Sequence, residues 1–350
     1  MSAAELDSAP ASQAPLTETT AGDKTTYPEW YNEVCADLSR LPSTSGGDRL
    51  DGMRAVLTRA SWMWDNGQVL TCAFVEPAGD AIQQAKVISV AKEWERYANL
   101  KLDFQSAARN PLSAIIRISF GKGLGSWSTV GKIALHPSVK DQATMNFGWV
   151  FNETPEPTAN ERAVILHEFG HAIGYLHEHQ SPRRGDKLKL KEEEAFKYFR
   201  DTQTPPWTKQ QVRANFLNVY NQSEVSNYSS VDLTSIMMYF MPPNLNEQGI
   251  RIPRNYELDA LDKAFAFLNY PFLGGLTSSD ASHTLDNALN TIGVTGKFRE
   301  SITAEFNEND WKGVRAEFTR WTLNAKAEAS REEAVAEREA EADAGVQTDS

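Results

Sequence analysis

The first half of the chain alternates between strand-like and helix-like patterns of hydrophobic positions. Alternating or nearly continuous apolar runs predict five strands, at residues 67–76, 100–105, 113–120, 127–136 and 143–150. Apolar side chains recur at helical spacing over 80–100, which predicts a long amphipathic helix between the first two strands. A second helix is predicted over 157–174, with Thr158 or Asn160 as its cap and Gly174 as its stop. These patterns indicate a unit of mixed strands and helices.

After residue 180 the strand-like patterns end, and the chain is predicted to be mostly helical. Helices are expected at 190–199, 209–220 and 257–270, and a loop rich in turn residues at 228–240. Further on, one helix face carries an apolar stripe, formed by Trp311, Val314, Phe318, Trp321 and Ala325. We expect this stripe to pack on the protein's own domain rather than to dock a partner.

Composition divides the chain into four segments. Residues 1–26 are rich in Ala, Ser, Thr and Pro and are predicted to be disordered. Residues 27–60 are interpreted as a helical lead-in or a pro-segment, and residues 61–272 as the main domain. Residues 273–350 are interpreted as a helical extension that ends in an acidic, Ala- and Glu-rich tail.

Composition and charge also exclude several classes of protein. The chain has 350 residues, of which 41% are hydrophobic and 23% charged, as is typical of a globular protein. No apolar run is long enough for a membrane helix, and the net charge of −12 argues against nucleic-acid binding. The N-terminus lacks the basic and apolar regions of a secretory signal, so a cytoplasmic location is favoured over a non-standard route of secretion. Cys35 and Cys72 are expected to be free thiols.

Four of the six histidines lie within one stretch, HEFGHAIGYLHEH, at residues 167–179. Residues four apart share one face of a helix, so His167 and His171 are spaced to bind a single metal ion. Glu168 is rotated by about 100° from His167 around the helix. From there it can hold a water beside the metal without becoming a ligand. The segment therefore has the HExxH pattern in which the glutamate acts as a general base.

A catalytic zinc ion needs a third protein ligand, and His177 is the candidate. On a continuous helix, His177 would lie on the far side from His171. Gly174 can end the helix with a positive φ and turn the chain back under the metal. The full pattern HExxHxxGxxH is expected by chance in about one chain in a hundred thousand. The alternative, a helix with core-satisfied or solvated histidines, would leave three imidazoles and a carboxylate to be satisfied on a strongly apolar helix.

The extended motif resembles that of the metzincins, a superfamily of zinc endopeptidases with a methionine turn below the metal. A second element follows at SIMMY, residues 235–239, which looks like the Ser-x-Met-x-Tyr turn of the astacins and serralysins. The resemblance implies that Met237 is the turn methionine. It also implies that Tyr239 reaches the zinc or the transition-state oxyanion.

The residues around the third histidine are similar to those of the astacins, which carry Glu directly after it, here Glu178. HEHQSP, SIMMY and LDALDKAFAFLNYP together look like the astacin-like metalloproteases of fungi and bacteria, over about residues 60–272. The chain departs from typical astacins in lacking their four disulfide cysteines and in having Met238 where they usually have His. In astacins the glutamate pairs with a buried mature N-terminus, and these departures leave the role of Glu178 open.

The resemblance implies an α+β, metzincin-type zincin-like fold: a twisted mixed sheet with a backing helix and the zinc helix above a cleft, and a mostly helical lower subdomain. It implies a zinc metalloendopeptidase that acts on proteins or peptides. In this reading Zn²⁺ is bound by His167, His171 and His177, and Glu168 is the general base. The alternative is a non-catalytic zinc protein that binds peptides or serves in assembly.

Three further hypotheses concern substrate binding and latency. The segment ATMNFGWV at 143–150 resembles the metzincin edge strand that pairs with extended substrate. Cys35 or Asp48 could occupy the open zinc position and keep the enzyme latent. Arg251 or Arg254, after the methionine turn, could favour acidic substrate residues. His179 is either a partner of the ligands or a solvated loop residue.

Overall fold

The fold is described from a computed structural model. It describes residues 62–181, 184–203, 205–219 and 231–325. The expected disordered segment 1–26, the lead-in or pro-segment 27–60 with Cys35 and Asp48, and the acidic tail from residue 326 lie outside these ranges. The predictions for those segments therefore stay predictions.

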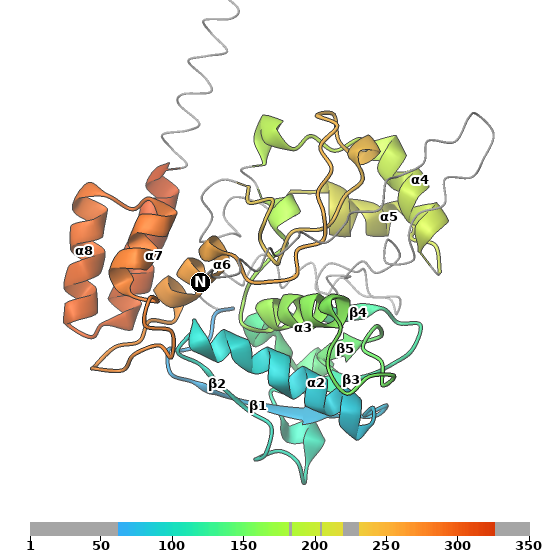
Figure 1. The fold of residues 1–350 in the computed structure, drawn as a ribbon, viewed down its shortest axis with the longest axis horizontal. Coiled ribbons are helices and arrows are strands. Elements are labelled where there is room, and N and C mark those ends of the chain that lie inside the picture. The colour runs from blue at the N-terminus through green and yellow to red at the C-terminus, as the bar shows by residue number, and fades with distance from the viewer. Residues whose placement is uncertain (1–61, 182–183, 204, 220–230, 326–350) are drawn as a thin grey trace, which may run out of the picture.

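The first half of the described chain forms a mixed five-stranded sheet (Figure 1). Its strands are β1 (Val69–Phe74), β2 (Lys101–Asp103), β3 (Ile116–Ser119), β4 (Ser126–Ser128) and β5 (Met145–Phe147). Their order is β2-β1-β3-β5-β4, and only β4 runs antiparallel to its neighbour. Every residue of the central strand β3 is buried, as its continuous apolar character predicted.

Two expectations about the last strands were wrong. The strand expected over 127–136 ends at Ser128, and the chain continues as a 3-10 helix over Gly131–Leu135. In this short helix the buried residues Gly131 and Ala134 are three apart, a spacing that a short apolar run does not distinguish from a strand. The segment 143–150 is not an edge strand either, because β5 pairs with β3 on one side and β4 on the other. The edge strand on this side of the sheet is β4, and β2 forms the opposite edge.

Two helices, α2 and α3, pack against each other and share one hydrophobic core with the sheet (Figure 1). Helix α2 (Ala81–Ala91) begins at a capping box formed by Asp80 and Gln83, and continues as a 3-10 helix over Lys92–Arg96. Helix α3 (Ala159–Ala172) begins at Thr158, one of the two predicted caps. Each residue of α3 from Ala163 to Ala172 is buried, so α3 runs through the centre of the protein.

A buried ion pair joins α2 to the start of α3. The Nζ atom of Lys86 lies 2.9 Å from Oε1 of Glu161, and their side chains are 1% and 4% exposed. Lys86 also donates to the carbonyl of Phe151 at 3.0 Å. Glu161 accepts from the backbone amide of Thr158 at 2.7 Å, which completes the capping box of α3. The charge of Lys86 is therefore compensated by the same carboxylate that caps the central helix.

The second half of the chain forms a separate, mostly helical layer, on the other side of α3 from the sheet in Figure 1. It contains α4 (Glu192–Thr202) and α5 (Lys209–Val212), which continues as a π-helix over Arg213–Leu217. These segments share a second core cluster with the turn around Met238 and Tyr239. The other short 3-10 segments of the described chain are Pro111–Ser113, Pro137–Val139, Glu178–Gln180, Gly185–Lys187 and Pro243–Leu245.

The C-terminal helices pack on α6 (Ala260–Asn269), which follows the turn. They are α7 (Leu285–Ile292), α8 (Gly296–Asn307) and a helix over 311–325. Val314 and Phe318 of the apolar stripe are fully buried in a cluster that includes Phe267 of α6. The expectation that the stripe packs on its own protein is confirmed. Within the described ranges, no helix combines the length and apolar character needed to cross a membrane.

The ion pair of Lys86 and Glu161 provides a test of this packing. We expect Lys86→Met to lower the free energy of unfolding by about 3–5 kcal/mol, because it leaves the Glu161 carboxylate buried without its cation. Arg299→Met is the matched control, since Arg299 pairs with the largely exposed Asp286 and should contribute about 1 kcal/mol or less. Urea denaturation measures both. Equal small losses in the two variants would contradict the importance assigned to the buried pair.

Candidate metal centre

Helix α3 brings the first two histidines together at the centre of the protein. The ring centroids of His167 and His171 are 4.9 Å apart, and the rings meet edge to face. His167 is 9% exposed, and His171 is fully buried. Glu168, between them in sequence, is also buried. The spacing of four residues therefore places both imidazoles on one face, as predicted.

Gly174 ends the helix and turns the chain toward the third histidine. Its φ is 110°, and its backbone amide donates to the carbonyl of His171 at 2.9 Å. The backbone angle favours glycine here, and a Cβ atom at this position would lie 2.5 Å from Sδ of Met63, so a larger residue would also displace that side chain. After this turn His177 lies with its Nε2 atom 3.0 Å from Nε2 of His171.

Backbone carbonyls orient two of the three rings. Nδ1 of His167 donates to the carbonyl of Ile236 at 2.8 Å, and Nδ1 of His171 donates to that of Tyr175 at 2.9 Å. A proton on Nδ1 leaves Nε2 of the neutral ring with the lone pair that a metal needs. The two imidazoles are thus held in the tautomer that directs Nε2 toward the centre of the triad.

The three histidines fit a zinc ion. One ligand nitrogen from each ring can be chosen so that all three lie within 4.8 Å of one another. Zinc binds imidazole nitrogen at about 2.0–2.1 Å, so two ligands of a tetrahedral site lie about 3.3 Å apart, close to the 3.0 Å seen between His171 and His177. Nε2 of His167 is buried without a hydrogen-bond partner among the described residues, and a cation would satisfy it. Burial, and then the neighbouring His171, lower the pKa of His167 to about 3, so its ring is neutral and able to bind metal at pH 7.

The turn that contains Met237 is fixed to α6 and to α3. Asp262 of α6 accepts hydrogen bonds from Oγ of Ser235 at 2.7 Å and from the amide of Ile236 at 2.8 Å. The carbonyl of Ile236 in turn accepts from His167. Met237 is buried against Gly170 of α3, where a Cβ atom would lie 2.5 Å from the methionine Sδ. The turn therefore packs directly on the helix that carries the first two histidines.

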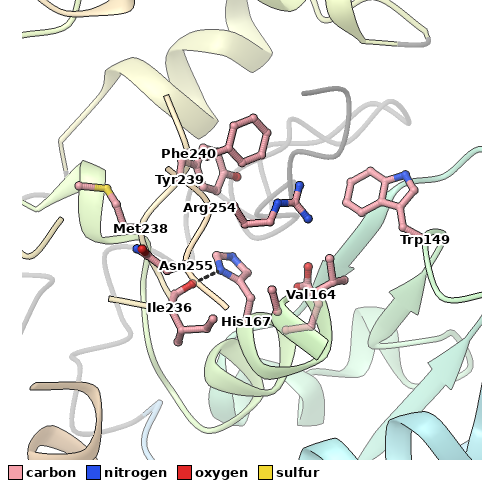
Figure 2. A pocket seen from close by; sticks show the side chains of 11 residues that line it. Trp149, Val164, His167, Ile236, Met238, Tyr239, Phe240, Arg254 and Asn255 are labelled. Carbon is pink, nitrogen blue, oxygen red and sulfur yellow. Dashed lines mark hydrogen bonds between the residues drawn. The ribbon is translucent and has the colours of Figure 1, made fainter. Parts of the chain in front are cut away.

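A pocket opens beside His167 (Figure 2). It is lined by Glu168 and Tyr239, and Trp149 lies across it from His167. The ring centroid of Tyr239 is 4.5 Å from that of His177. The candidate base and the candidate phenol thus lie in one pocket at the edge of the histidine triad.

Two comparisons with known proteins place this geometry in a family. Residues 57–249, more than half of the chain, match the family model of Astacin, a family of peptidases. The chain belongs to the astacin family. The structure of myroilysin is 32% identical with a TM-score of 0.54, and the match covers 61% of this chain and 98% of that one. The astacin fold and the family resemblance drawn from the motifs are therefore confirmed.

Other relatives match less closely. High choriolytic enzyme 1, a hatching enzyme zinc-protease from Oryzias latipes, is 14% identical with a TM-score of 0.39, over 59% of this chain and 94% of that one. Protein SpAN from Strongylocentrotus purpuratus is 28% identical over 118 residues, which are 33% of this chain and 17% of that protein. The matched part of this astacin thus spans about a sixth of its curated relative.

Within this astacin, sequence reasoning missed several residues that support the site. Asp262 lies 25 residues from Met237 in sequence, and LDALD showed only a helix start. Gly170 lies inside the motif at a position written as x, yet its lack of a side chain admits Met237. His179 is fully buried, so the interpretation as a solvated loop residue is wrong.

The structure also shows the surroundings of the other residues singled out from the sequence of this astacin. Arg254 lines the pocket, with its guanidinium 4.9 Å from the ring centroid of Phe240, whereas Arg251 is not among the lining residues. Cys72 is buried, and burial raises the pKa of its thiol, so it does not resemble a metal ligand. Glu178 accepts from the amide of Asp232 at 3.0 Å, and burial raises its pKa.

The two carboxylates at the start of α6, Asp259 and Asp262, predict a pH dependence of stability. Burial, together with neighbouring acidic groups, raises the pKa of Asp259 and of Asp262. Between the ordinary and the raised pKa the folded protein binds more protons than the unfolded chain, so this contribution to stability falls as pH rises. Asp259→Asn cannot ionise but keeps an oxygen to cap α6. We therefore expect the unfolding free energy of the variant, relative to wild type, to rise by about 1 kcal/mol or more from pH 5 to pH 8.

Chemical denaturation at the two pH values checks this expectation. Asp286→Asn, at a largely exposed carboxylate, is the control and should show no such trend. A relative stability of Asp259→Asn that does not change with pH would show that the carboxylates near the turn are not under this strain.

Proposed function

We propose that the chain is a zinc-dependent endopeptidase that hydrolyses peptide bonds in protein or peptide substrates. Membership of the astacin family, a family of zinc metallopeptidases, supports the reaction class. The observation that carries the proposal is the position of Glu168. Glu168 follows His167 in the sequence and lines the same pocket, beside three histidines that fit zinc.

His167, His171 and His177 would hold the metal, which when bound lowers the pKa of a water to about 7 and polarises the substrate carbonyl. The chain's own residues supply the rest. Glu168 takes a proton from the attacking water and passes it to the nitrogen of the leaving amine. The same carboxylate thus acts first as a general base and then as a general acid. Because Glu168 is almost fully buried, its carboxylate acts in a setting with little competing water.

Tyr239 is the proposed donor to the oxyanion. A phenol can donate a hydrogen bond to the negative oxygen that develops as the carbonyl becomes tetrahedral, and removing one such donor typically costs about 10²–10³ in kcat. Its ring lies beside His177 and lines the pocket with Glu168, which supports this role.

The second candidate is a non-catalytic zinc protein that holds peptides in the cleft or serves in assembly. Such a protein needs the three histidines and the pocket but has no use for a general base. The presence of Glu168 in the pocket favours the peptidase.

The variant Glu168→Gln separates the two candidates. We expect it to bind zinc at the wild-type level, since no ligand is changed. Its kcat should fall by about 10²–10⁴-fold, the usual contribution of a general base. Cleavage of a quenched fluorescent peptide measures kcat, and elemental analysis measures zinc. Wild-type protein treated with a chelator should lose activity and regain it when zinc is added.

Wild-type protein that is folded and zinc-loaded but cleaves neither casein nor a mixed peptide library would contradict the peptidase. Substantial turnover in Glu168→Gln would leave the peptidase in place but would assign the general base to a different residue.

A further inference from the structure

His179 follows Glu178 in the HEHQSP segment, and it is fully buried next to Tyr239. The rings of His179 and Tyr239 are stacked, with centroids 4.2 Å apart and planes 26° from parallel. The ring of Phe216 lies 5.3 Å from that of His179 and 6.4 Å from that of Tyr239, so it borders both rings. Tyr239 therefore has His179 against one face, while the ring of His177 meets it edge to face at 4.5 Å.

A hydrogen bond fixes the plane of the His179 ring. Its Nε2 donates to the carbonyl oxygen of Asn215 at 3.1 Å. Asn215 lies in the π-helix Arg213–Leu217, close to its end, where backbone carbonyls are left without partners in the helix itself. The end of this helix thus provides an acceptor within reach of the His179 ring.

Other contacts hold the same segment against the π-helix. Gln180 donates from Nε2 to the carbonyls of Ala214 at 2.9 Å and Asn218 at 2.8 Å. Nη1 of Arg184 donates to the carbonyl of His179 at 2.8 Å. His179 is therefore held by contacts of its backbone, of its neighbour Gln180 and of its own ring, and none of these contacts involves Tyr239.

We infer that His179 is a positioning residue that fixes the ring of Tyr239 beside the histidine triad. The inference rests on the proposed function. A hydroxyl that donates to a developing oxyanion is effective only if it is held in place before the reaction, because reorganisation would otherwise add to the barrier. The flat face of an anchored imidazole limits the tilt of the phenol ring.

A double-mutant cycle tests whether His179 acts through Tyr239. We expect His179→Leu to lower kcat at least about 10-fold, but by no more than the roughly 10²–10³-fold that complete loss of an oxyanion donor costs, and to change KM by less than about 3-fold. In a Tyr239→Phe background, where the hydroxyl is absent, the same change should lower kcat by less than about 3-fold. A purely structural role would lower kcat by the same factor in both backgrounds.

Conservative replacements extend the test. His179→Phe keeps a flat ring against Tyr239 but not the bond to Asn215, so it should retain more activity than His179→Leu. If His179→Leu does not fold, His179→Gln, which keeps a donor for Asn215 but has no ring, takes its place in the cycle. Zinc content and thermal stability are measured for each variant, so that loss of metal or fold is not counted as loss of positioning.

His283→Leu is the matched control. The His283 ring meets Tyr97 edge to face at 5.1 Å and its Nε2 donates to the Tyr97 carbonyl at 2.9 Å, so this histidine also combines a tyrosine contact with a backbone hydrogen bond, but outside the site. The kcat of the His283→Leu variant should equal that of the wild type.

Two results would overturn this inference while leaving the peptidase intact. In both, the wild-type protein is active. In the first, His179→Leu lowers kcat by the same factor with Tyr239 and with Tyr239→Phe, and in the second, Tyr239→Phe leaves kcat unchanged. Zinc-loaded wild-type protein without activity would instead overturn the proposed function.

Discussion

The structure depends on the convergence of three buried imidazoles from two differently folded segments. Polar side chains buried on an apolar helix are costly unless each finds a partner. His167 and His171 come from α3, but His177 can reach them only because Gly174 reverses the chain with a φ of 110°. Carbonyls satisfy Nδ1 of the first two rings, and the remaining nitrogen of His167 is directed at the centre of the triad. The cost of burying these groups is thus offset by backbone acceptors and by a cation that the triad fits.

The methionine turn connects helix α6 to this site through a chain of hydrogen bonds. Asp262 at the start of α6 fixes Ser235 and Ile236, and the carbonyl of Ile236 then orients His167. At the other end of α3, Lys86 and Glu161 hold the start of the helix to α2. The helix that carries the ligands is therefore fixed at its beginning by the sheet-bearing half and at its end by the turn. The third histidine shares this support, because the amide of Glu178 donates to the carbonyl of Met237.

Local sequence patterns were sufficient for several elements of the fold and for the gathering of the three histidines. Helix α3 with its Thr158 cap and the approach of His167, His171 and His177 follow from short-range spacing and from the conformational freedom of Gly174. The mixed sheet was expected only from the resemblance to the metzincins. Features that depend on long-range packing were not predictable in this way. The roles of Asp262 and Gly170 appear only once the turn is placed against α3, and the burial of His179 only once the π-helix provides the carbonyl of Asn215. The strand expected over 127–136 failed for a related reason, since the apolar spacing in that segment suits a 3-10 helix equally well.

X-ray absorption at the zinc edge, on protein purified without chelators, tests the central claim most directly. We predict one zinc per chain with three imidazole nitrogens at about 2.0–2.1 Å, together with oxygen ligands and no sulfur. A spectrum with fewer than three imidazoles, with sulfur ligation, or from protein that retains no zinc would contradict the convergence of His167, His171 and His177 on one metal ion.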